Sequence, residues 1–124
     1  MKRLTRQECF NKVWKAFVVQ GKPKSSIAGC CLYQHPTIPS HGCAIGVCLT
    51  QTQRDEFGDC FGGVEELFIT FPHLAKRFPE KSIEFLRLLQ GTHDDPEPGQ
   101  SFTKNITSNL REFAKDRHLT IPKG

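Results

Sequence analysis

The segment CCLYQHPTIPSHGCAIGVCL, residues 30–49, decides the predicted fold class and holds four of the six cysteines of this 124-residue chain. Read as a strand, residues 43–49 place alternate side chains on one apolar face, which consists of Cys43, Ile45, Val47 and Leu49. The other face carries small residues, and residues 28–33 alternate in a similar way. Proline and glycine in the intervening loop favour turns. The segment therefore predicts an antiparallel β-hairpin with a long loop.

Upstream of this segment the apolar spacing is helical. Thr5 and Glu8 have the spacing of a capping box, which predicts a helix start, and Gly21 is a typical residue just after a helix end. Between them one apolar stripe has the i, i+3, i+4 and i+7 spacing of a buried helix face. Its members are Phe10, Val13, Trp14, Phe17 and Val18.

Helical spacing also occurs downstream, in residues 64–71, from Pro79 to Gly91, and after Ser101. Together these patterns predict an α+β fold, in which four to five helices pack around a short antiparallel β-hairpin. The length is typical of one domain, so we expect a single domain over residues 1–124.

The composition predicts a soluble cytoplasmic protein. Hydrophobic residues make up 37% and charged residues 24% of the chain, and no run approaches the roughly 20 apolar residues that span a membrane. The basic start is followed by a helical pattern that contains lysines, where a signal peptide has an unbroken apolar stretch. In the cytoplasm thiols stay reduced, so a disulfide framework is not expected.

Positive charge is concentrated at the start of the chain, and the formal net charge is +4. Residues 1–24 contain seven lysines and arginines and one acidic residue, Glu8. Such a segment can attract phosphate groups or an acidic protein surface. The predicted contact residues are Lys12, Lys15, Lys22 and Lys24, with Tyr33, His35 and His41 of the loop as a second set. No nucleic-acid-binding motif accompanies these lysines, which disfavours nucleic acid as the partner.

The cysteines and histidines leave two alternatives open. Cys31, His35, His41 and Cys43 could form a zinc site if the loop curls back, although their spacing fits no common ligand pattern. Zinc is therefore an alternative, and no cofactor is the first expectation. A small thiol enzyme or metal-dependent hydrolase is the other alternative, on Cys31 beside His35, on Cys60, or on the run His93-Asp94-Asp95. No familiar catalytic or nucleotide-binding motif supports an enzyme.

Four short motifs carry a resemblance along most of the chain. They are CLY (31–33), CAIG (43–46), LLQGTHDD (88–95) and KDRHL (115–119). In this order they resemble small proteins of unknown function encoded in bacterial and phage genomes. The resemblance implies a phage or mobile-element accessory protein, which binds and blocks host machinery or sequesters a nucleotide signal used in defence.

The sequence thus predicts a non-enzymatic binding protein. Its expected partner is a host protein or a nucleotide-like small molecule, and no membrane is involved. A homo-oligomer is one form in which such a protein could act.

Overall fold

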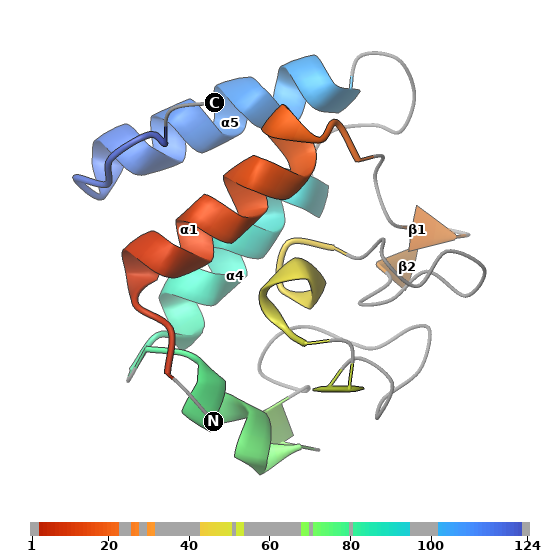
Figure 1. Cartoon of the computed structure of the whole chain (residues 1–124), viewed down its shortest axis with the longest axis vertical. Helices are drawn as coiled ribbons and strands as arrows, with labels where there is room; N and C mark the ends of the chain where they lie inside the picture. The colour runs from red at the N-terminus through yellow and green to blue at the C-terminus, as the bar shows by residue number, and fades with distance from the viewer. Residues whose placement is uncertain are drawn as a thin grey trace.

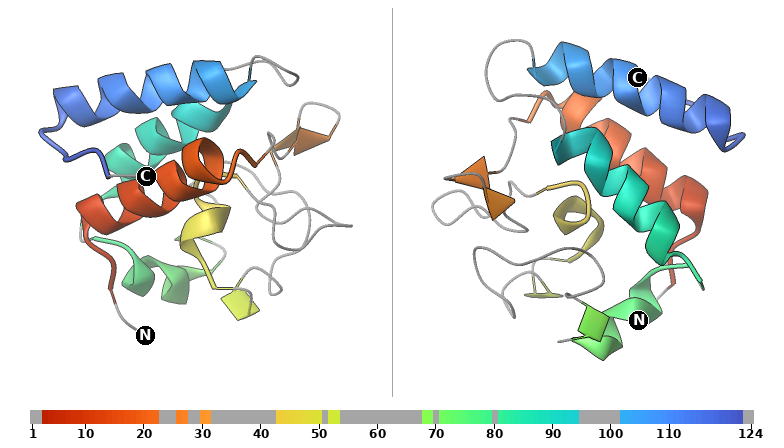
Figure 2. Two further views of the ribbon diagram at one scale, coloured as in Figure 1. Left: turned by 45° about the horizontal axis from the view of Figure 1, so that its top comes forward. Right: turned by 180° about the vertical axis from the view of Figure 1, so that it is seen from behind.

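The computed structural model describes residues 3–22, 26–27, 30–31, 43–50, 52–53, 68–69, 71–79, 81–94 and 102–122. Within these ranges the protein is mostly helical. The α-helices are α1 (Arg6–Trp14), α4 (Ile83–Asp94) and α5 (Phe102–Asp116). Shorter elements are the π-helix η1 (Lys15–Val19) and two 3-10 helices, η2 (Gly46–Cys48) and η3 (Pro72–Arg77). Figures 1 and 2 show α1, α4 and α5 packed together, with η2 and η3 on the side away from α5.

Helix α1 begins as its sequence predicts. The Thr5 hydroxyl oxygen accepts a hydrogen bond from the Glu8 N–H at 3.1 Å, and the Glu8 carboxylate accepts one from the Thr5 N–H at 3.0 Å. This capping box satisfies backbone groups that have no partner inside the helix. Past Trp14 the helix continues as the π-helix η1 and ends at Gly21, whose φ is +64°.

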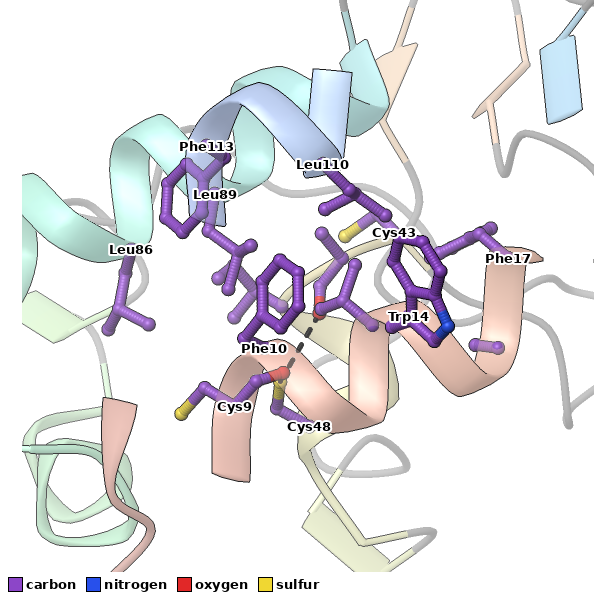
Figure 3. Close-up of a cluster of buried hydrophobic side chains, with 14 of the residues drawn as sticks. Cys9, Phe10, Trp14, Phe17, Cys43, Cys48, Leu86, Leu89, Leu110 and Phe113 are labelled. Carbon is purple, nitrogen blue, oxygen red and sulfur yellow. Dashed lines mark hydrogen bonds between the residues drawn. The ribbon is translucent and has the colours of Figure 1, made fainter. Parts of the chain in front are cut away.

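The aromatic stripe of the first helix is the centre of the core (Figure 3). Phe10 stacks on Phe113 of α5 with ring centroids 6.2 Å apart, and Phe17 meets Phe102 edge-on at 6.0 Å. Phe113 also contacts Phe85 of α4 at 5.3 Å. Each fully buried side chain of this size stabilises the fold by about 1.5–3 kcal/mol, so the three α-helices are held together mainly by these rings.

The predicted β-hairpin is wrong, and with it the α+β class. Residues 43–49 form a turn followed by η2, with hydrogen bonds from the Val47 N–H to the Cys43 oxygen and from the Cys48 N–H to the Ile45 oxygen. The only pairing of strands in the described ranges joins β1 (Ser26–Ile27) to β2 (Cys30–Cys31), two residues on each side. So short a ladder is not a layer of the fold.

The alternation in residues 43–49 led to a wrong strand prediction because both faces of this segment are covered. Six of its seven residues are buried and Val47 is half-buried, so the segment has no exposed face to reveal its period. A short apolar run of this kind is compatible with either a strand or a helical turn. The short helix η2 at the end of this segment packs against α1.

Two further predictions concern helix lengths. Helix α4 continues through Gly91 to Asp94, beyond the predicted end, because Thr92 and His93 are buried and the core holds this last turn in place. The predicted helix over residues 64–71 lies largely outside the described residues. No helix in the part of the chain described here has the length and apolarity needed to cross a membrane.

Candidate functional site

Three of the four predicted lysines come together in the fold. Lys12 of α1, Lys15 of η1 and Lys22 line an open hollow of about 190 Å³. The other described residues of the lining are Ala16, Gln20 and Val47, and Val47 comes from η2, which packs beside the first helix. We call this site the lysine hollow. Lys24 lies outside the described residues.

The local backbone explains how Lys22 joins the two helical lysines. In η1 the Gln20 N–H donates to the Lys15 oxygen at 2.9 Å, which is the wide turn of a π-helix. Gly21 then adopts the left-handed conformation that glycine tolerates best. As a result the Lys22 N–H reaches back to the Ala16 oxygen at 3.0 Å. The chain therefore folds back over the last turn of η1 and places Lys22 beside Lys15.

The electrostatics of the lysine hollow favour an anion. The described residues of its lining include three charged residues, all of them cations, and no carboxylate. Lys12 and Lys15 are exposed and stand three residues apart, where like charges on a helix repel by about 0.2–0.5 kcal/mol. Within the described residues neither has an ion-pair partner. A bound phosphate or carboxylate group would relieve this repulsion and accept hydrogen bonds from the ammonium groups.

The second predicted set and the zinc alternative fall mainly outside the described residues. Tyr33, His35 and His41 are not described, and Cys31 is described only as part of β2. Cys43 is fully buried in the core. Among the described residues, no group of three or more histidine, cysteine, aspartate or glutamate side chains is arranged to hold a metal ion.

Three of the cysteine thiols belong to the core. Cys9, Cys43 and Cys48 are free and buried. The Cys48 sulfur lies 3.4 Å from the Ala44 carbonyl oxygen and 3.7 Å from the Cys9 carbonyl oxygen (Figure 3). Each of these oxygens can accept a hydrogen bond from the thiol. The side-chain hydrogen bond with Cys9 and burial together hold the pKa of Cys48 well above that of an ordinary thiol. Because the thiolate is the nucleophile, this environment suits a structural cysteine rather than a catalytic one.

His93, a candidate of the hydrolase alternative, is also buried. Its ring lies 5.1 Å from that of Phe17 and 5.6 Å from that of Phe102, and none of the side chain is exposed. It lies on the last turn of α4, beyond Gly91, where the sequence predicts that the helix ends. A substrate in solution has no direct access to this ring.

Sequence reasoning missed a second basic surface. Two larger open hollows are lined by cations from distant parts of the chain, namely Arg3, Arg6, Lys76, Lys81 and Arg117. The only signal in the sequence is the basic character of each short segment. Folding is what places these segments side by side.

Comparisons with protein-family models, with curated proteins and with solved structures find no match to this chain.

Proposed function

We propose that this protein is a non-enzymatic binding protein that holds a phosphate-bearing small ligand, of the nucleotide-like class, at the lysine hollow. The observation that carries the proposal is the convergence of Lys12, Lys15 and Lys22 around one hollow, in whose lining the part of the chain that the structure describes places no acidic residue. Phosphate is a strong acceptor of charge-assisted hydrogen bonds, and lysine is a common point-charge ligand for it.

The volume of the hollow indicates which part of the ligand it can contact. Pockets that enclose a whole drug-sized molecule have volumes of about 300–1,000 Å³, whereas the lysine hollow has about 190 Å³. Its lining is mainly polar and cationic. It therefore suits the phosphate groups of a ligand, with the remainder of the molecule extending outside it.

The buried positions of the described thiols and of His93 favour binding over catalysis at these groups. A nucleophilic cysteine needs a lowered pKa and access to substrate, and Cys48 has neither feature. In this proposal the protein acts by binding its ligand and keeping it from other molecules.

Calorimetric titration tests the proposal directly. The probes are inorganic phosphate, pyrophosphate and a nucleoside triphosphate, added to the wild-type protein and to the triple variant Lys12→Gln, Lys15→Gln, Lys22→Gln. Glutamine keeps the helix propensity of lysine and removes its charge. The control is Lys104→Gln with Lys115→Gln, because both of these lysines are exposed on α5 and line none of the three hollows.

We expect affinity to rise with the number of phosphates and to fall at least about tenfold in the triple variant, which corresponds to about 1.4 kcal/mol. The control should bind as the wild type does. Equal binding by the triple variant, or no binding of any probe by the wild type, would overturn the proposal. Native mass spectrometry of gently purified protein adds a second readout, since a ligand that co-purifies identifies its own class by mass.

A further inference from the structure

A second surface involves the start of the first helix, because Arg3 and Arg6 line it, whereas the lysine hollow is lined by residues from Lys12 onward. Two open hollows of about 480 and 390 Å³ share Lys81 in their linings. Consecutive residues of α4 also line them, Ile83 the first and Glu84 the second. The two hollows are therefore neighbours, and together we call them the basic groove.

Part of the lining of the basic groove is apolar, and we call these apolar lining residues its floor. Phe68, Pro79 and Ile83 line the first hollow, and Phe85, Leu88 and Leu119 line the second. Ile83 is 40% and Leu88 is 41% exposed, although both belong to a helix whose other face is in the core. Exposed apolar side chains that gather in a hollow with polar surroundings are typical of a surface that binds a partner.

The described linings also contain five cations, which are Arg3, Arg6, Lys76, Lys81 and Arg117. Among the described residues that line the two hollows, the only carboxylate is that of Glu84, which is in an ion pair with Arg87 at 3.0 Å. The described cations are distributed over both hollows, so each hollow has positively charged side chains in its lining.

The three arginines are held in place before any partner arrives. Arg3 donates a hydrogen bond from Nη1 to the Phe78 oxygen at 2.6 Å. The guanidinium of Arg6 lies 5.5 Å from the centre of the Phe85 ring, and that of Arg117 lies 4.2 Å from the centre of the Phe113 ring. Each guanidinium has five N–H donors, so these contacts leave donors for carboxylates. Ordering them in advance lowers the entropy cost of binding.

We propose that the basic groove binds an acidic peptide segment of a partner protein, with its apolar side chains on the floor and its carboxylates on the five cations. The distribution of the cations favours this occupant over an anionic lipid, because a single head group would satisfy only one end of the groove. A segment with several carboxylates along its length matches charges in both hollows. This site is separate from the lysine hollow and does not depend on the function proposed there.

The test is selection from a displayed random-peptide library on the immobilised wild-type protein. We expect the enriched peptides to combine several Asp or Glu residues with Leu, Phe or other large apolar residues. A fluorescein-labelled peptide from this set is then titrated against Lys76→Gln with Lys81→Gln, against Leu88→Gln, and against the control Lys104→Gln with Lys115→Gln. All of these positions are exposed, so the variants should fold.

The double lysine variant should bind the peptide at least about tenfold more weakly, the loss of about one charge-assisted contact. Leu88→Gln should also weaken binding, and the control should not. Three outcomes would overturn the proposal: no enrichment, enrichment of peptides without acidic residues, or equal affinity for wild type and the double variant. Sedimentation with vesicles of phosphatidylserine and phosphatidylcholine separates the lipid alternative, since vesicle binding that is lost in the double variant, without peptide binding, would assign the groove to a lipid surface instead.

Discussion

The side-chain amide oxygen of Gln90 accepts a hydrogen bond from the backbone N–H of Ile45 at 3.0 Å, and both residues are buried. Ile45 stands directly before η2, where a short helix leaves backbone N–H groups without partners inside the helix. Gln90 of α4 thus supplies the hydrogen-bond acceptor that the short turn does not provide for this N–H. This contact ties residues 43–49 to the helical core.

Replacing Gln90 with leucine should therefore destabilise the protein. The buried Ile45 N–H would lose its partner, which costs about 1–3 kcal/mol, and the melting temperature should fall by about 4 °C or more. Thermal unfolding followed by circular dichroism measures the change. The matched control on the same helix is Arg87→Gln, which removes an exposed ion pair worth less than about 0.5 kcal/mol. If Gln90→Leu melted no lower than this control, the structural role assigned to Gln90 would be wrong.

Local signals predicted the first helix and failed for the segment that gave the fold class. The capping box of Thr5 and Glu8 is confirmed because its residues interact within one turn of the chain. Residues 43–49 are different, since their conformation depends on contacts with α1 and on Gln90, 45 residues away. No pattern in the segment itself contains that information.

The two candidate sites also differ in whether their residues are close together in the sequence. Lys12, Lys15 and Lys22 are near each other in sequence, so a basic run was enough to predict them together, although the π-helix that brings Lys22 back has no signal in the sequence. The basic groove draws Arg3, Lys76 and Arg117 from three separate parts of the chain. Only tertiary packing joins them, and for that reason sequence reasoning missed the groove.

Gly21 and Gly91 should respond in opposite directions to substitution by alanine. Gly21 has a φ of +64°, where a side chain costs about 1–2 kcal/mol. Gly91 lies in α4 with ordinary φ and open space around it, so alanine there should stabilise the protein by about 0.5–1 kcal/mol. Urea unfolding measures both changes. Gly21→Ala should also weaken anion binding, because the turn that places Lys22 depends on it; stabilisation by Gly21→Ala would contradict this account.

The buried thiol of Cys48 should make stability fall as the pH becomes alkaline. Its pKa is raised in the folded protein by the hydrogen bond with Cys9 and by burial, whereas in the unfolded chain a thiol ionises at about pH 8.5. Above that pH the unfolded state releases a proton that the folded state keeps, so the free energy of unfolding decreases with pH. Cys48→Ala removes this contribution.

Urea unfolding between pH 7 and pH 10 tests whether the free energy of unfolding decreases with pH in this way. The variant will be less stable at neutral pH because it leaves a cavity, and its stability should decline less steeply than that of the wild type above pH 8.5. Parallel curves would show that Cys48 does not titrate differently in the two states. Native-state alkylation gives an independent check, since Cys48 should react with iodoacetamide far more slowly in the folded protein than in urea.

The lysine hollow and the basic groove should bind independently. Among the described residues, the two sites share no lining residue. The variant Lys12→Gln, Lys15→Gln, Lys22→Gln should lose affinity for pyrophosphate and keep its affinity for a selected acidic peptide. Lys76→Gln with Lys81→Gln should show the reverse pattern. Both ligands should bind more weakly as salt is raised, because the screening length shortens from about 10 Å at 0.1 M to about 3 Å at 1 M ionic strength. If either variant lost both ligands equally, the two surfaces would form one extended binding site, or binding would follow only the net charge of the protein.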